Sequence, residues 1–187
     1  VGDGYKVTFA DNTDFLTIPS TTQAGWQVVG TSLGTFAYKV NANAVTELNL
    51  LGNLGNASFR KAGDLYGVIL LPETATGADI EAARKLLIDR GAADGATGGN
   101  YYAAWLQRPD IVEFKSFDAS TMTVLTFAFA GQTNLVSFPS MSFPNGTSFD
   151  YAWNGSPSLT SLGTIQAPLG ANFTSAWQNC TALTSFP

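Results

Sequence analysis

The stretch from Ser148 to Gly163 reads SFDYAWNGSPSLTSLG, and related stretches occur 24 residues earlier and 24 residues later. The earlier one lies within LTFAFAGQTNLVSFPS, residues 125–140, and the later one within NFTSAWQNCTALTSFP, residues 172–187. Self-similarity at a fixed period of roughly 20 to 50 residues is the signature of repeat architectures. One such unit is too small to bury its own apolar face, so we expect successive units to stack and share a core.

Columns of equivalent residues indicate how each unit is built. The columns are Ile111, Leu135, Leu159 and Leu183; Phe114, Phe138, Leu162 and Phe186; Leu125, Phe149 and Phe173; Ala128, Ala152 and Ala176; and Phe129, Trp153 and Trp177. The first two columns, with polar residues between them, predict a short strand. Phe149, Ala152 and Trp153 stand at i, i+3 and i+4, which is one face of a short helix or a single turn. The sequence therefore predicts an α/β solenoid, a leucine-rich-repeat-like array with units of about 24 residues.

The periodicity divides the chain into three parts. Residues 111–187 hold the regular units. Because no polar cap follows the last strand motif, LTSFP, we expect the array to continue beyond residue 187 or its end to be sealed by another subunit. Residues 45–110 are predicted as divergent repeats with a helix at about 77–90, where Thr76 and Asp79 have the spacing of a capping box. Residues 1–44 alternate apolar and polar residues and are predicted as a small β segment that caps the array or attaches it to a larger particle.

The composition argues against several classes of protein. Hydrophobic residues make up 45% of the chain and charged residues 12%, which is incompatible with intrinsic disorder. The apolar runs are too short to span a membrane, so membrane insertion is not expected. The net charge is −5 and no basic residue follows Lys115, so nucleic acid is not expected as a partner. The single cysteine, Cys180, has no partner for an internal disulfide and is interpreted as a small buried apolar residue.

The sequence offers little chemistry for catalysis. It contains no histidine, the commonest general base and metal ligand, and no glycine-rich phosphate loop followed by a lysine. Asp118 and Asp150 are the only charged residues after Lys115, and they occupy different positions in the repeat, so we predict no working carboxylate pair. We therefore predict a non-enzymatic protein with no catalytic residue, no cofactor and no metal site.

Two sets of residues are candidates for binding a partner. The aromatic column beside the small alanines is interpreted as core and comprises Trp105, Phe129, Trp153 and Trp177. The residue just before each alanine varies, and at two of these positions it is Phe127 or Tyr151, which we expect to be exposed. Exposed aromatic rings can stack on a sugar or seat a protein partner. Repeat arrays also bind on their strand face, where the candidates are Ser137, Thr160, Ser161 and Thr184.

Two stretches carry a resemblance to known proteins. AWQNCTALTSFP, residues 176–187, resembles the BspA-like leucine-rich repeats of bacterial adhesins, protist surface proteins and large virus or phage proteins. DLYGVILLPETATGADIEAARKLLIDRGAADGAT, residues 64–97, together with the AW repeats, resembles virion-associated proteins of marine cyanophages. The resemblance covers about residues 45–187 and implies a leucine-rich-repeat fold on a virion surface or outside the cell.

The residues and the resemblance together support two hypotheses of different kinds. The first is a phage tail-fibre, appendage or adhesin module that recognises a host-surface glycan or a protein receptor. The alternative is a purely structural virion component that decorates or connects subunits and binds no host ligand, and a more distant one is a polysaccharide depolymerase. The expected partners include other virion or surface-protein subunits, and the chain is expected to belong to a homo-oligomer or a larger assembly.

Overall fold

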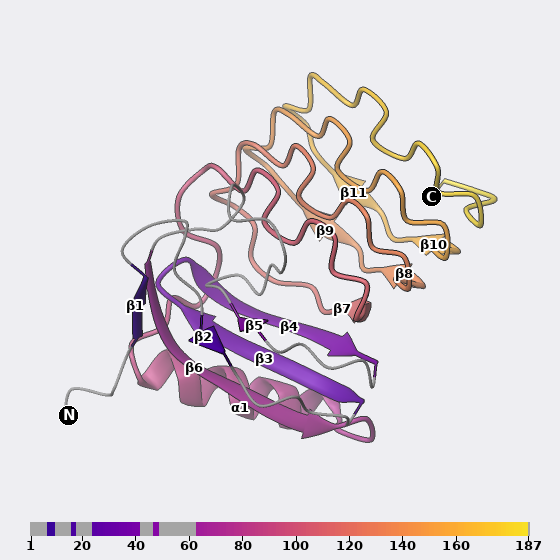
Figure 1. Cartoon of the computed structure of the whole chain (residues 1–187). Coiled ribbons are helices and arrows are strands. Elements are labelled where there is room, and N and C mark those ends of the chain that lie inside the picture. Colours follow the sequence, from indigo (N-terminus) through magenta and orange to yellow (C-terminus); the bar gives the residue numbers. More distant parts are fainter. Residues whose placement is uncertain (1–6, 10–15, 18–23, 42–46, 49–62, 187) are drawn as a thin grey trace.

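The structure, a computed structural model, describes residues 7–9, 16–17, 24–41, 47–48 and 63–186. Figure 1 shows an antiparallel sheet with a helix beneath it, and a stack of turns and short strands that leads away from the sheet. The helix is α1 (Gly77–Asp89). The strands are β1 (Val7–Phe9), β2 (Leu16–Thr17), β3 (Gly25–Thr31), β4 (Gly34–Val40), β5 (Glu47–Leu48), β6 (Gly63–Pro72), β7 (Ile111–Phe114), β8 (Ser137–Phe138), β9 (Met141–Ser142), β10 (Ser161–Leu162) and β11 (Ile165–Gln166).

The antiparallel part is built on a tight hairpin. β3 and β4 are joined by Ser32 and Leu33 and pair along their whole length. Gly34 has a φ of 145°, a conformation that L-residues rarely adopt, so glycine permits the turn. β6 pairs with the other edge of β3, and β1 pairs with β6. β3 is therefore a central strand, and its successive side chains alternate between two covered faces.

Each face of this sheet has its own core. On one face Val28 packs with the buried residues of α1, which are Ile80, Ala83 and Leu87. On the other face the adjacent Val29 and its cross-strand partner Phe36 pack with side chains of the repeat units. α1 and the repeat stack consequently lie on opposite faces of the sheet, as Figure 1 shows.

The start of α1 follows from a local sequence signal. Thr76 accepts a hydrogen bond from the Asp79 N–H at 3.2 Å, and the Asp79 carboxylate accepts one from the Thr76 N–H at 2.8 Å. This capping box satisfies two backbone donors that the first helical turn leaves unpaired. α1 thus lies in the segment where the sequence predicts a helix, but it belongs to the antiparallel sheet and not to a repeat unit.

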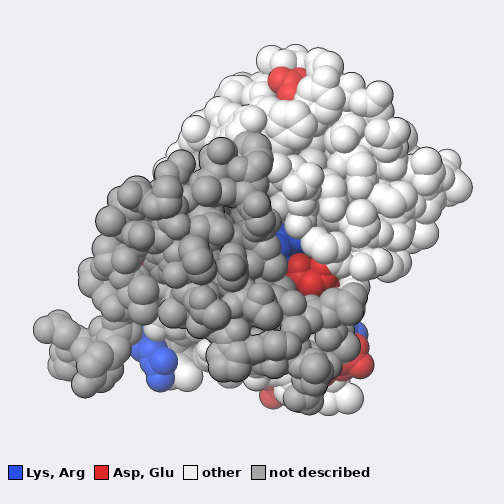
Figure 2. Space-filling model, in the orientation of Figure 1, with Lys and Arg blue, Asp and Glu red and all other residues white. Residues whose placement is uncertain are grey.

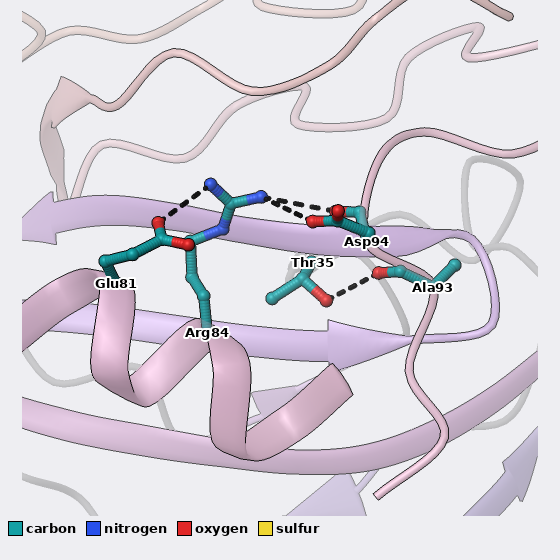
Figure 3. Close-up of polar contacts among 5 residues, drawn as sticks. All are labelled: Thr35, Glu81, Arg84, Ala93 and Asp94. Atoms are coloured by element: carbon teal, nitrogen blue, oxygen red, sulfur yellow. Dashed lines mark hydrogen bonds and ion pairs between the residues drawn. The ribbon is translucent and has the colours of Figure 1, made fainter. Parts of the chain in front are cut away.

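The connection from α1 to the repeats is held by polar contacts (Figure 3). Arg84 of α1 reaches Glu81 at 3.4 Å and the Asp94 carboxylate at 3.2 Å. Thr35 of β4 donates a hydrogen bond to the carbonyl of Ala93 at 2.6 Å. The segment after the helix is therefore tied to both the helix and the sheet before the first unit begins.

The units stack in register in the order of the sequence. β8 pairs in parallel with β10, placing Ser137 opposite Ser161, and β9 pairs in parallel with β11, placing Met141 opposite Ile165. Parallel bridges also connect a further series of residues at the same 24-residue spacing, which are Asn100, Val124, Ser148 and Asn172. Segments that the repeat phase aligns are therefore neighbours in space.

Strand β7 joins the two parts of the molecule. It pairs antiparallel with β4, where Tyr38 lies opposite Phe114, and in parallel with β8, where Glu113 lies opposite Ser137. The result is a seven-stranded mixed sheet in the order β1-β6-β3-β4-β7-β8-β10. β4 thereby covers the strand edge that the first unit would otherwise leave unpaired.

The aromatic segment of each unit is a turn. In one unit the Ala152 N–H bonds to the Phe149 carbonyl three residues back at 3.0 Å, whereas the Trp153 N–H bonds to the Ala176 carbonyl of the next unit at 2.8 Å. Tyr151 has a φ of 55°, in the left-handed region. A left-handed residue is incompatible with a continuing right-handed helix, so the i, i+3, i+4 spacing here marks a turn.

The expected α/β solenoid, a leucine-rich-repeat-like array, is therefore wrong. The described chain is mostly sheet and turn, and its helix packs on the antiparallel sheet, not between repeat strands. The mixed sheet does not close into a solenoid. The physical reason is that alternate N–H groups of each aromatic turn bond to the neighbouring unit, which leaves no i to i−4 ladder for a helix. Of the divergent repeats expected over 45–110, residues 45–46 and 49–62 lie outside the described residues.

A ladder of parallel aromatic rings fills the core of the stack. Its ring centroids are 5.1, 5.7 and 5.8 Å apart in sequence order, and its members are Trp105, Phe129, Trp153 and Trp177. The first three are fully buried, which confirms the interpretation of this column as core. Trp177 is half-buried because it lies in the last unit, with Phe186 against its ring edge at 5.2 Å.

Two buried polar groups lie beside this ladder. Arg108 is fully buried and forms a two-pronged ion pair with Asp110, with nitrogen–oxygen distances of 2.7 and 2.6 Å. Its guanidinium lies 5.1 Å from the ring centre of Tyr38, so the pair connects the first unit with β4. Cys180 is buried, its thiol donates to the Trp153 carbonyl at 3.1 Å, and burial raises its pKa, which fits its interpretation as an unreactive core residue.

Candidate binding surface

The residues before the small alanines of two units carry aromatic side chains that reach the surface, whereas Ala103, in the same column, is buried. Ala128 and Ala152 are fully buried, whereas the preceding residues, Phe127 and Tyr151, are partly exposed. The rings of Phe127 and Tyr151 stack face to face, with centroids 4.8 Å apart and planes 9° apart. Tyr102 is 38% exposed and packs its ring edge-on to Phe127 at 6.0 Å. We call Tyr102, Phe127 and Tyr151 the aromatic strip.

Two residues of the aromatic strip have a left-handed backbone. Phe127 has a φ of 57° and Tyr151 a φ of 55°, a left-handed conformation in which Gly or Asn is favoured. An L-residue with a bulky side chain costs about 1–2 kcal/mol in this region. Ala103 and Ser175, the equivalent residues of the other units, have φ values of 53° and 51°. The left-handed conformation therefore belongs to the turn of every unit, and in two units it carries a large aromatic side chain.

An open groove of about 370 Å³ runs beside the strip. Its lining includes Tyr102, Phe127, Gln107, Gly131, Asn154 and Gly155, and none of its lining residues is charged. Gly131 and Gly155 have φ values of 71° and 70°. A Cβ at Gly131 would lie 2.9 Å from Gln107 Cγ, so glycine at this position also allows the turn of Gly131 to approach the turn of Gln107 closely. The groove therefore combines ring edges, side-chain amides and accessible backbone.

The surface around the repeat units carries very few charged groups. Figure 2 shows the repeat part of the molecule almost free of Lys, Arg, Asp and Glu on the face in view. Asp150 is engaged within the stack, because its carboxylate accepts hydrogen bonds from Asn172 Nδ2 at 2.6 Å and from the Thr174 N–H at 3.0 Å. Asp150 therefore links its own unit to the next one through these hydrogen bonds.

The strand-side candidates lie apart from the aromatic strip along the chain path of each unit. Ser137 is half-buried in β8 and pairs with the exposed Ser161 of β10. Thr160 is exposed, and its hydroxyl donates to the Val136 carbonyl at 3.1 Å. Thr184 is exposed in the last unit. These residues come from the strand segments of the units, whereas Phe127 and Tyr151 come from the turns.

Sequence reasoning missed three residues of this surface: Tyr102, Gln107 and Asn154. The 24-residue spacing places Ala103, not Tyr102, in the column of Phe127 and Tyr151. Tyr102 was missed because it lies one residue before that column, although its ring packs on Phe127. The tandem tyrosines at 101 and 102 are the signal that could have revealed it, because only one of the two can face the core.

Within the described ranges, no group of three or more Cys, Asp or Glu side chains is placed to hold a metal ion. Among the same residues, α1 is too short and too polar to be a membrane-crossing helix. Comparison of the chain with protein-family models, with curated proteins and with solved structures finds no match.

Proposed function

We propose that the protein is a non-enzymatic recognition module of a virion surface or cell surface, which binds its ligand through the aromatic strip. The observation that supports this most is the stack of the partly exposed rings of Phe127 and Tyr151 beside an uncharged groove. Partly exposed aromatic side chains supply large contact area at low conformational cost and dominate many binding surfaces. Parallel stacking of units keeps the rings at a fixed spacing before any ligand arrives, which lowers the entropy cost of binding.

The setting is proposed from the sequence resemblance to BspA-like repeats and to virion-associated proteins of cyanophages. The surface chemistry agrees with such a setting, because 12% charged residues and a net charge of −5 leave solubility of the stack to Ser, Thr, Asn and Gln. A nucleic-acid partner is disfavoured for the same reason, since phosphate neutralisation requires clustered Lys and Arg.

A glycan array and a panel of bacterial cells, probed with the labelled protein, test this proposal. We expect binding that falls at least tenfold when Phe127 and Tyr151 are both replaced by Ser, with little change in melting temperature. The matched control replaces Thr160 and Ser161 by Ala and retains binding. The opposite pattern would place the ligand on the strand side, and equal binding by all three proteins would refute a role for the aromatic strip.

A second function, that of a structural subunit, is favoured by the far end of the stack. There an apolar recess of about 400 Å³ is lined by Leu162, Ile165, Phe173, Trp177 and Phe186. Phe186 is 61% exposed, and no charged residue occurs from 151 onward, so a second copy could approach this face without charge repulsion. Light scattering over a concentration series should show self-association that Phe186→Ser weakens. A monomer at every concentration would contradict this alternative.

A further inference from the structure

We infer that the aromatic strip ends in a binding site for one neutral sugar ring, seated on the face of Tyr151 that points toward Ser175. This inference rests on the proposed recognition function and specifies its ligand class and position. Three observations support it. The turns of successive units place equivalent side chains in line, Ser175 carries no ring where Phe127 and Tyr151 carry one, and the same turns carry polar side chains.

The first step is the direction of the Tyr151 ring. Phe127 and Tyr151 hold equivalent places in successive units, and their rings lie 4.8 Å apart and nearly parallel. Both ring planes are therefore roughly perpendicular to the axis along which the units stack. One face of the Tyr151 ring is covered by Phe127, so the opposite face points to the next unit. Among the described residues no other aromatic ring contacts Tyr151.

The second step is the gap on that opposite face. Ser175 is the equivalent residue of the next unit, and its φ of 51° matches the 57° of Phe127 and the 55° of Tyr151. Its side chain therefore leaves the backbone in the same direction as theirs. Where they carry a six-membered ring, Ser175 carries a single hydroxyl group. The position that a third ring would take on the free face of Tyr151 is therefore not filled by a ring of this turn.

The third step is the polarity around the gap. Asn154 and Gln178 lie three residues after Tyr151 and Ser175, and Asn154 Nδ2 donates to Gln178 Oε1 at 3.3 Å. This bond leaves the side-chain oxygen of Asn154 as an acceptor and the side-chain NH2 group of Gln178 as a donor. Together with the Ser175 hydroxyl, the same two turns that carry Tyr151 and Ser175 therefore offer both donors and acceptors.

A pyranose fits this combination better than the alternatives. Its C–H face can lie on an aromatic ring while its equatorial hydroxyls point outward to polar groups. An aromatic side chain of a protein partner would fill the gap but leave those amides without partners, which is unfavourable once they are desolvated. The ligand is neutral because no Lys or Arg follows Lys115 in the chain, and the carboxylate of Asp150 is engaged by Asn172 and Thr174.

Filling the gap provides the sharpest test. Ser175→Phe places a ring where Phe127 and Tyr151 already carry one, so we expect the variant to fold and to keep its melting temperature. The probes are chitotriose, cellotriose and galactotriose, each titrated against the whole chain by saturation-transfer NMR. We expect at least one to bind the unmodified protein and to lose about tenfold or more in affinity with Ser175→Phe or Tyr151→Ala, which is the loss of roughly one stacking contact. Tyr151→Phe keeps the ring, so its affinity for the sugar should stay within about twofold of the unmodified protein, because the exposed hydroxyl contributes little.

The outcomes separate this inference from the proposed function. Ser161→Phe adds the same bulk on β10 and is expected to leave binding unchanged. Loss of binding with Tyr151→Ala but not with Ser175→Phe would place the sugar elsewhere on the strip, and this inference would fall while the proposed function stands. If none of the three sugars binds but binding to cells still depends on Ser175, the sugar assignment is overturned while the proposed recognition function stands. Absence of binding in both assays would end both proposals.

Discussion

Replacing Trp153 by alanine should show how much the aromatic ladder stabilises the stack. Trp153 is fully buried between Phe129 and Trp177, at 5.7 and 5.8 Å, with the edge of Phe138 at 5.3 Å. Truncation of a large aromatic in such a site costs roughly 3–5 kcal/mol, because the neighbouring rings are held by their own units and cannot close the cavity. This is a large share of the approximately 5–15 kcal/mol that stabilises a typical domain. The melting temperature should fall by roughly 6–20 °C for a chain of this size.

Two control variants make this prediction specific. Trp153 Nε1 is buried without a hydrogen-bond partner among the described residues, so Trp153→Phe removes an unsatisfied donor as well as some contact. Phe129 shows that the column accepts this ring, and we expect Trp153→Phe to change stability by no more than about 1 kcal/mol. Tyr151→Ala, on the exposed strip, should cost less than about 1 kcal/mol. Urea unfolding followed by far-UV circular dichroism measures all three, and equal losses for Trp153→Ala and Tyr151→Ala would refute the assignment of core and surface columns.

The remaining predictions concern backbone strain, the buried ion pair and alkaline pH. Gly155→Ala should lower stability by about 1–2 kcal/mol because φ is 70°, while Gly155→Asn should cost less, as Asn179 occupies the equivalent place at 64°; equal melting temperatures would contradict this. Asp110→Ala should cost about 3–5 kcal/mol in urea unfolding, because it removes the carboxylate that neutralises the buried Arg108 guanidinium, and a loss below about 1 kcal/mol would show that water reaches the site. Burial raises the pKa of Tyr101, so its contribution to stability is complete below about pH 10 and is lost as pH rises toward the folded-state pKa. Melting temperatures measured from about pH 8 to 11 should therefore fall less steeply in Tyr101→Phe than in the unmodified protein, and parallel curves would argue against this.

The sequence by itself determined the features that depend on local pattern. The 24-residue phase identified Phe129 and Trp153 as core, because a residue type repeated at one spacing must meet its equivalents when units stack. It also placed a helix near 77–90, since the capping box of Thr76 and Asp79 is formed by residues three apart in the chain.

Only the tertiary structure decided what depends on partners distant in the chain. The spacing of Phe149, Ala152 and Trp153 suits a helix and a turn equally well, and the turn forms because the Trp153 N–H finds the carbonyl of Ala176 in the next unit. The pairing of β4 with β7, which joins the antiparallel sheet to the repeats, has no local signal, because strand pairing is a choice between segments far apart. The same holds for the aromatic strip: the phase indicated that Phe127 and Tyr151 vary outside the core, but their contact with each other and with Tyr102 arises only when the left-handed turns are brought together by stacking.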